Sequence, residues 1–264
     1  MLIVTADDYG RDRRATDAIL RCGAAGRITA ASAMVFMGDS TRAASLAGGS
    51  SIEFGLHLNF TEPLDEAGAP ASLRRDHTRT RAYLTRRRLA PALYSPRLRR
   101  AFASLVEAQR GEFERLYGRS PAFFNGHHHM HLCSNVLLEG LMPPGACVRN
   151  SFTFEAGEKS LFNRAYRGLV SRWVRARYTS TDAFFSIAPI GDLDRLRRLV
   201  RRSEHEAVEL ETHPEDPSES AFLLGSVYAE LLASARSGGF RDLPLRGAAA
   251  RTPTERRARP EPRA

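Results

Sequence analysis

Four short segments of the chain concentrate carboxylates and histidines. They are residues 5–10 (TADDYG), 55–59 (GLHLN), 125–131 (NGHHHMH) and 209–215 (ELETHPE). Neutral imidazole and carboxylate groups bind divalent metal ions, and both also transfer protons. Each segment stands where a short apolar run ends, so together they predict a metal-dependent hydrolase site at the ends of several strands.

The first segment contains the pair Asp7 and Asp8. Along an extended backbone, successive side chains leave on opposite sides, so one carboxylate could bind a metal ion while the other acts as a base. The structural alternative is that one of the two caps the following helix or starts an Asx-turn, which is frequent for aspartate.

The second and fourth segments each place one histidine near a strand end. Alternation puts His57 on the face opposite Leu56 and Leu58. His213, which precedes Pro214, would be placed for proton transfer if this end of the sheet holds the active site. Either histidine could instead be a structural residue that satisfies a nearby hydrogen-bonding group.

The third segment holds four of the chain's eight histidines within five positions. If extended, it would turn His127, His129 and His131 to one side and His128 to the other. Alternate residues of a strand are about 6.5 to 7 Å apart, so we do not expect all three to reach one ion at about 2.1 Å. We expect one or two metal ligands here, with His129 and His131 among the residues that orient ligands or touch substrate.

Short apolar runs alternate with amphipathic stretches along the chain. The strand candidates are residues 2–6, 29–36, 52–59, 122–127, 146–149 and 206–212, and the helix candidates are 12–22, 97–117, 136–141, 161–177, 193–202 and 219–235. This alternation predicts an α/β fold with a mainly parallel sheet, open or closed into a barrel. The four segments would then meet at the carboxyl ends of the strands, where such folds place their chemistry.

The chain is long enough for one large domain, and we expect a single catalytic domain over residues 1–247. Within it, residues 63–120 form a long insertion whose first half is either a lid over the site or a surface loop. From residue 248 to 264, proline, arginine and alanine dominate without periodicity, which predicts a disordered basic tail.

Arginine carries almost all of the positive charge behind the formal net charge of +9, since Lys159 is the only lysine. The excess would attract nucleic acid, a phosphate-bearing substrate or a membrane surface, or it reflects codon usage alone. The basic stretch 164–177 likewise suits a lipid-linked or diphosphate-bearing substrate, or is a solvated helix face. Because no nucleic-acid-binding motif is present, we expect no specific nucleic-acid partner and at most peripheral membrane association.

The three cysteines lie far apart without a CxxC pair, which predicts neither a disulfide framework nor a cysteine zinc site. The start of the chain lacks the basic region of a signal peptide, and no run of about 18 to 20 apolar residues follows it. These features predict a cytoplasmic protein.

The segments ADDYG, GLHLNF, NGHHHMHL and ETHP resemble, in order and spacing, the four motifs of the YdjC-like carbohydrate deacetylases. The resemblance covers roughly residues 1–245 and implies an irregular, TIM-barrel-like (β/α) barrel that binds a divalent ion, Mg²⁺ or Zn²⁺. It also implies that the substrate is an N-acetylated sugar or glycoconjugate, which is hydrolysed to a free amine and acetate. A homodimer would fit the same resemblance.

By motif position, the resemblance implies that Asp8, His57 and His127 bind the metal ion. Asp7 would then act as the base that takes a proton from the attacking water. His213 would serve as the acid or as an orienting group.

Arg149 and Glu209 are implied as supporting positions. The chain departs from the family's usual fourth motif at Thr212 and Glu215. Neither difference removes a predicted ligand, so the departure concerns the range of substrates.

Two other classes of function stay open. A His-x-His pattern at a strand end also serves metal-dependent phosphoesterases and cyclic-amide hydrolases, although a two-metal phosphoesterase needs more carboxylate ligands. The chain could also be a non-catalytic module that binds metal or nucleic acid. Salt-sensitive, sequence-indifferent DNA binding would be the expected sign of charge alone.

Overall fold

The computed structural model describes residues 1–65, 67–154 and 160–244. The predicted tail at 248–264 and the predicted domain limit at residue 247 lie outside these ranges.

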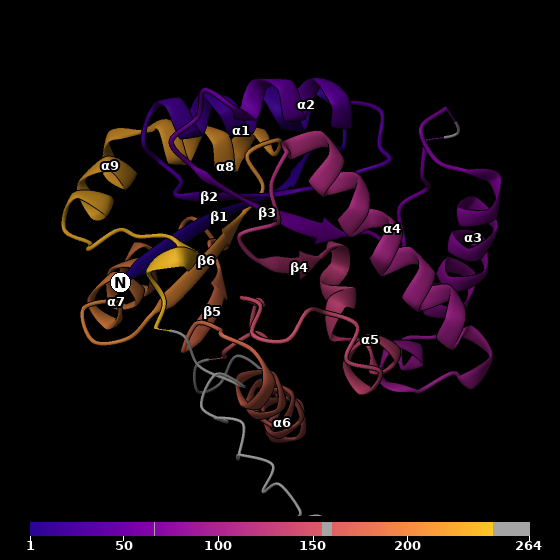
Figure 1. The fold of residues 1–264 in the computed structure, drawn as a ribbon. Coiled ribbons are helices and arrows are strands. Elements are labelled where there is room, and N and C mark those ends of the chain that lie inside the picture. The colour runs from indigo at the N-terminus through magenta and orange to yellow at the C-terminus, as the bar shows by residue number, and fades with distance from the viewer. Residues whose placement is uncertain (66, 155–159, 245–264) are drawn as a thin grey trace, which may run out of the picture.

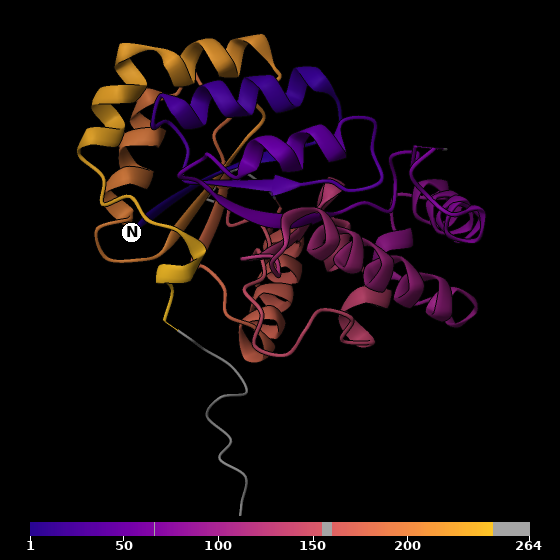
Figure 2. The ribbon, with the colours of Figure 1, turned by 45° about the horizontal axis from the view of Figure 1, so that its top comes forward.

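Six parallel strands within the described ranges form one sheet, in the order β4-β3-β2-β1-β6-β5 (Figure 1). Their bounds are Leu2–Tyr9 (β1), Ala30–Ala33 (β2), Glu53–Leu58 (β3), Phe124–Gly126 (β4), Ala183–Ser186 (β5) and Val208–Thr212 (β6). The sheet curls into a half-barrel with helices around it (Figure 2). The prediction of a parallel, barrel-like α/β fold is confirmed.

Helices connect the strands. The α-helices are Arg13–Ala24 (α1), Ser40–Ala47 (α2), Ala71–Arg86 (α3), Arg99–Tyr117 (α4), Ser134–Leu138 (α5), Leu161–Arg177 (α6), Leu193–Arg202 (α7), Pro217–Leu224 (α8) and Ser226–Ala233 (α9), and the 3-10 helices are Ala90–Ala92 (η1), Pro96–Leu98 (η2), His127–Leu132 (η3) and Phe240–Asp242 (η4). The single helix predicted over 219–235 is two helices, because the backbone at Gly225 is extended. Among the described residues, no helix has the length and apolar character needed to cross a bilayer.

Helix α1 shows how a local sequence signal sets an element. Asp12 caps the helix, and its side chain accepts a hydrogen bond from Ala15 N at 2.9 Å. The buried face carries Ala15, Ala18, Ile19 and Cys22, as the helical periodicity predicted. Because Asp12 fills the capping position, the alternative in which Asp7 or Asp8 caps this helix is wrong.

Two isolated bridges span the gap between β4 and β5. Phe124 of β4 bridges to Val148, and Cys147 bridges to Thr179, which leads into β5. The strand predicted at 146–149 therefore lies between the two edges of the sheet but forms single bridges instead of a ladder. This position directs the next residue, Arg149, into the interior, where it is 0% exposed.

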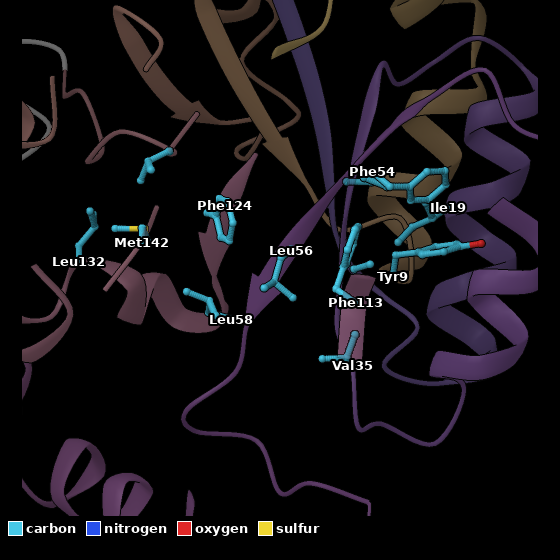
Figure 3. Close-up of a cluster of buried hydrophobic side chains, with 14 of the residues drawn as sticks. Tyr9, Ile19, Val35, Phe54, Leu56, Leu58, Phe113, Phe124, Leu132 and Met142 are labelled. Atoms are coloured by element: carbon cyan, nitrogen blue, oxygen red, sulfur yellow. The ribbon is translucent and has the colours of Figure 1, made fainter. Parts of the chain in front are cut away.

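The main apolar core lies between the sheet and the surrounding helices, which include α1, α2, α4 and α7. Tyr9, Phe54 and Phe113 gather beside β3 (Figure 3), and the ring centroids of Tyr9 and Phe54 are 5.0 Å apart. Leu56 and Leu58 of β3 join the same cluster. Burial of each such side chain contributes roughly 1.5 to 3 kcal/mol. This packing fixes the register of β3 and leaves His57, by alternation, on the opposite face.

The second half of the insertion belongs to the core. The amphipathic helix predicted over 97–117 is confirmed as η2 followed by α4. The buried side chain of Gln109 accepts a hydrogen bond from Asn59 N at 2.7 Å and donates one to Asn59 O at 3.1 Å. These bonds fix the end of β3, two residues after His57. Helix α3 lies outside α4 (Figure 1), and a lid function for the first half of the insertion stays a prediction.

A buried histidine of α3 makes the fold sensitive to acid. His77 is 3% exposed, and within the described structure its Nε2 has no hydrogen-bond partner. Burial, with a smaller effect of Arg81, lowers its pKa from 6.5 to about 4. Between these two values the unfolded chain binds more protons, so stability falls as the pH falls, by about 1.4 kcal/mol per pH unit.

We therefore expect His77→Gln to reduce the loss of unfolding free energy between pH 7 and 4.5 by about 2 kcal/mol. Urea titrations at the two pH values measure this difference. The exposed His205→Gln serves as the control. Equal acid sensitivity of His77→Gln and the wild type would contradict the assignment.

Candidate active site

Both aspartates of β1 face the same site. Asp8 has a positive φ of 69°, and the pairing of β1 with β2 shifts register between Ala6 and Tyr9. His57 consequently lies near both carboxylates, with Nδ1 4.0 Å from Asp7 Oδ2 and Nε2 3.2 Å from Asp8 Oδ1. The expectation that the two side chains leave on opposite sides is wrong, because it assumed a regular strand.

Asp8, His57 and His127 form a buried group of three donors. One ligand atom of each lies within 4.8 Å of the others, and His127 Nδ1 is 2.9 Å from Asp8 Oδ1. Two atoms bound to one ion at about 2.1 Å in tetrahedral geometry are about 3.4 Å apart, so this spacing suits a shared ion. Two imidazoles with one carboxylate also match hydrolytic zinc sites that keep a position open. The residues present therefore fit a divalent metal ion.

The charges of this group favour a bound cation. Burial would raise the pKa of Asp8, but hydrogen bonds with His127 and His57 outweigh it and hold that pKa well below its ordinary value. Burial would lower the pKa of His57, but Asp7 and Asp8 raise it. When His57 Nε2 carries no proton, this nitrogen and Asp8 Oδ1 are both hydrogen-bond acceptors. Two acceptors 3.2 Å apart need a proton or a cation between them.

Asn125 orients His57. The Asn125 amide nitrogen donates to Asp7 Oδ1 at 3.2 Å, which turns Asn125 Oδ1 toward His57 Nδ1 at 2.7 Å. His57 Nδ1 then carries the proton, and the lone pair of Nε2 points at Asp8. Asn125 lies in the third motif but was not predicted as a site residue.

Removing this orienting group should weaken metal binding without removing a ligand. We expect Asn125→Ala to lower the affinity for Zn²⁺ by about 10- to 100-fold, the usual cost of losing a partner of a metal-binding histidine. Calorimetric titration of metal-stripped protein measures the change. Asn150→Ala is the matched control, because buried Asn150 bonds instead to Thr181 O and Ser151 N. Equal affinities of the two variants would contradict the orienting role.

Arg149 is the centre of a second buried cluster. Its Nη1 and Nη2 lie 2.5 and 2.8 Å from the two carboxylate oxygens of Asp7, and its Nε lies 2.7 Å from Glu209 Oε1. Nη1 also lies 3.0 Å from Glu211 Oε1, and the guanidinium stands 4.7 Å from the ring centroid of Phe184. The structure thus places Arg149 and Glu209 together behind Asp7, where they position it and are shielded from solvent.

The cluster separates the proton affinities of Asp7 and Glu211. Burial would raise the pKa of Asp7, but Arg149 holds it well below its ordinary range. Burial and the charge of Asp7 raise the pKa of Glu211 well above its ordinary value. Half-buried His213 offers a ring nitrogen within 4.8 Å of both carboxylates. One ionised carboxylate beside a protonated one is the arrangement that acid–base pairs use.

The turn that carries His213 is fixed by α8. The backbone N–H of His213 and the hydroxyl of Thr212 both donate to Glu219, each at 2.7 Å. Asp216 caps the helix through Ser218 N at 2.8 Å. Glu219 was not predicted as a supporting residue.

The histidine segment is not extended. Residues 127–132 form η3, and His128 and His129 have positive φ values of 53° and 58°. The expectation that His127, His129 and His131 face one side is therefore wrong, because it assumed a strand. Gly126 permits the turn, since a Cβ there would lie 2.9 Å from His131 N.

Each of the four histidines has its own environment. His127 contacts Asp8, and His128 Nδ1 lies 3.0 Å from Thr61 Oγ1. His129 Nε2 is 3.7 Å from Glu211 Oε1, next to the buried cluster around Arg149. The fourth, His131, is fully buried and bonds through Nε2 to Arg149 O at 3.2 Å. The segment therefore brings His127 to the Asp8–His57–His127 group and His129 to Glu211. His131 holds the backbone at Arg149.

Further contacts complete the site without any sequence signal. Arg11 Nη1 lies 2.5 Å from Asp8 Oδ2, and Ser32 Oγ donates to Asp7 Oδ1 at 2.6 Å. Glu215, one of the departures from the family pattern, lies at 3.5 Å from Arg11 Nη2. It therefore stands at the edge of the site, beside a residue that holds Asp8.

A cavity of about 480 Å³ opens beside the site. His128 and His129 form one part of its wall, and Arg167 of α6 forms another. Apolar side chains such as Leu89 and Met130 line the rest. The cavity offers room for a substrate larger than the few atoms that react.

The chain is a parallel α/β half-barrel with an aspartate–histidine group at the carboxyl edge of its sheet. The YdjC-like protein family matches residues 1–242, so the chain belongs to this family. The resemblance seen in the four motifs is thereby confirmed.

Three relatives with assigned names share sequence with the chain. A carbohydrate deacetylase of Mus musculus is 32% identical over 145 residues, 51% of this chain and 44% of that protein. A carbohydrate deacetylase of Homo sapiens is 34% identical over 140 residues, 51% of this chain and 42% of that protein. A chitooligosaccharide deacetylase of Serratia marcescens is 29% identical over 226 residues, 81% of each protein. The chain thus spans less than half the length of the two mammalian relatives.

A solved structure from Enterococcus faecalis V583 has a similar fold. That protein, named for the cleavage of cellobiose phosphate, matches with a TM-score of 0.61 at 18% identity, over 91% of this chain and 97% of that chain. At this identity the likeness concerns the fold alone.

Proposed function

We propose that the protein is a metal-dependent hydrolase that removes the acetyl group from an N-acetylated sugar. Relatives named carbohydrate deacetylase and chitooligosaccharide deacetylase support this choice of reaction. The observation that carries it is the buried Asp8–His57–His127 donor group, with the ionised Asp7 on the other side of the His57 ring.

In this proposal Asp8, His57 and His127 hold the divalent ion. When bound, such an ion polarises an amide carbonyl and lowers the pKa of water. Asp7 stays ionised beside Arg149 and accepts the proton of the attacking water. Because Asp7 also receives hydrogen bonds from Ser32 and Asn125, its carboxylate is held in one orientation during that transfer.

The second proton transfer takes place at His213 and Glu211. Cleavage of the amide requires a proton on the departing amine, and His213 is the half-buried group placed to deliver it. Glu211, with its raised pKa, can hold a proton next to His213. The products would be the free amino sugar and acetate.

A two-metal phosphoesterase is a weaker proposal for this site. Asp7, Glu211 and His213 form a second group with the spacing of metal ligands. However, the guanidinium of Arg149 already lies 2.5 Å from Asp7 and 3.0 Å from Glu211. Arg149 therefore supplies the positive charge that a second ion would bring.

The deciding experiment is acetate release from N-acetylated sugars. Metal-stripped protein would be resupplied with Mg²⁺, Zn²⁺ or Mn²⁺ and incubated with diacetylchitobiose and sugar-nucleotide or lipid-linked N-acetylglucosamine. We expect release that depends on the added ion. Phosphatase activity exceeding deacetylation, or equal acetate release with and without metal, would reject the proposal.

A further inference from the structure

Helix α6 turns a row of arginines toward a cavity outside the active site. Arg164, Arg167 and Arg175 recur at helical spacing on one face, and they line a cavity of about 370 Å³. Arg202 at the end of α7 lines the same cavity from the other side. Arg164, Arg167 and Arg175 are half-buried, whereas Arg172 of the same helix is exposed.

Among the described residues, four arginines and one acid, Asp182, line this cavity, so its positive charge exceeds its negative charge. Arg202 pairs with Glu206 at 2.7 Å. In the part of the chain that the structure describes, Arg164, Arg167 and Arg175 have no carboxylate within 4.0 Å. Arg167 Nε is buried without a hydrogen-bond partner among the same residues. Charges partly withdrawn from water are normally paired, so this excess of guanidiniums over carboxylates indicates an anionic ligand.

The cavity is adjacent to the active site. The ring of Phe152 lines the cavity and lies 4.5 Å, between ring centroids, from that of His129. Arg167 lines both this cavity and the larger one that opens beside His128 and His129. A ligand with its acetylated end at the active site could therefore place an anionic group within reach of Arg167.

We propose that this arginine cavity binds the phosphoryl or diphosphate group of a phosphate-linked N-acetylated sugar. The assignment rests on the proposed deacetylase function and specifies its substrate class. Arginine forks match phosphate oxygens in pairs, and the charge of three guanidiniums less that of Asp182 leaves about two positive charges for a diphosphate. A single sugar carboxylate would neutralise only part of this excess charge.

Binding of inorganic diphosphate tests the site independently of catalysis. Calorimetry at fixed ionic strength would compare the wild type, the double variant Arg164→Met/Arg175→Met and the single variant Arg172→Met. Arg172 lies on the exposed face of the same helix and controls for net charge. We expect the double variant to bind diphosphate at least about tenfold more weakly, because each charged hydrogen bond contributes substantially. Arg172→Met should bind within about twofold of the wild type, since exposed charges contribute little.

Steady-state kinetics then test the substrate class. The ratio of kcat/KM for UDP-N-acetylglucosamine, or for a lipid-diphosphate-linked N-acetylglucosamine, to that for neutral diacetylchitobiose should fall about tenfold in the double variant. The anionic substrate with the higher ratio in the wild type identifies the source of the diphosphate. If a uronate oligosaccharide inhibits turnover of the anionic substrate more strongly than diphosphate does, the assignment to phosphate is overturned.

The outcomes separate the two proposals. Diphosphate binding that is absent, or that is lost equally in Arg172→Met and the double variant, overturns the arginine site even if chitobiose is deacetylated. Site-specific diphosphate binding without acetate release from any substrate retains the site and rejects the deacetylase function.

Discussion

Replacement of Arg149 by methionine should lower the free energy of unfolding by about 3 to 5 kcal/mol, the usual cost of removing one partner of a buried ion pair. Arg149 is 0% exposed and contacts three buried carboxylates, those of Asp7, Glu209 and Glu211. Without the guanidinium, these groups would be buried acids that have lost their arginine partner. Urea denaturation of wild type and variant at pH 7 measures the loss.

The pH dependence of this loss has a definite sign. In the wild type, Arg149 depresses the pKa of Asp7, so the stability that this pair contributes is present above the unfolded pKa of 3.8. In the variant, burial would raise the pKa values of the three acids above those of the unfolded chain. The folded variant then binds more protons, and its stability falls as the pH rises from about 4 to 8. The difference between wild type and variant should therefore grow with pH.

Two further variants separate the ion pairs from general effects. The double variant Arg149→Met/Glu209→Gln should regain part of the stability that Arg149→Met loses. It removes the carboxylate charge of Glu209, which is paired with Arg149 Nε in the wild type and has no such partner in the single variant. Arg197→Met, which removes a surface pair with Asp194, should change stability by no more than about 1 kcal/mol. A similar small effect for Arg149→Met would show that the buried cluster does not hold the site together.

Asp8→Asn should lower the affinity for Zn²⁺ by more than about 100-fold, since even partners outside the ligand set cost 10- to 100-fold. The amide keeps the shape of the side chain but loses the charge that lies 3.2 Å from His57 and 2.9 Å from His127. If the metal ion is required for activity, acetate release falls at least as far. Calorimetry and acetate assays on the same protein would test both effects.

The pKa of His57 gives a second test, which needs no metal ion. In the wild type, burial opposes protonation of His57, but Asp7 and Asp8 raise its pKa above 6.5. Loss of the Asp8 charge should lower this pKa in the metal-stripped variant, which NMR titration of the imidazole would detect. Asp39→Asn is the matched control, because Asp39 is also buried but pairs with Arg42 at 2.9 Å. An unchanged His57 pKa and undiminished metal binding in Asp8→Asn would exclude the proposed ligand group.

Local sequence patterns predicted the class of fold and the position of the candidate site. Alternating apolar and amphipathic runs predicted an α/β fold with a mainly parallel sheet, open or closed into a barrel, and the same patterns put the four polar segments at strand ends. Regular periodicity is a local property, so it can be seen without coordinates. It also correctly assigned His57 to the face opposite Leu56 and Leu58, because β3 is a regular strand.

Sequence periodicity also indicated one residue that was overlooked. Glu211 lies two positions after Glu209 in β6, so alternation puts both on the inward face. The structure joins both to Arg149. By contrast, Arg11 and Ser32 carry no local signal, since their roles depend on how β2 and the first turn meet β1.

Contacts between distant segments of the chain set how the side chains converge. The positive φ of Asp8 and the turn at His128 and His129 break the alternation on which the sequence argument depended. Such conformations are unfavourable in isolation and persist only where surrounding contacts compensate for them. The approach of Arg149 to Asp7 joins residues 142 positions apart. Pairings of this kind are set by packing of the whole barrel, which no short segment of sequence encodes.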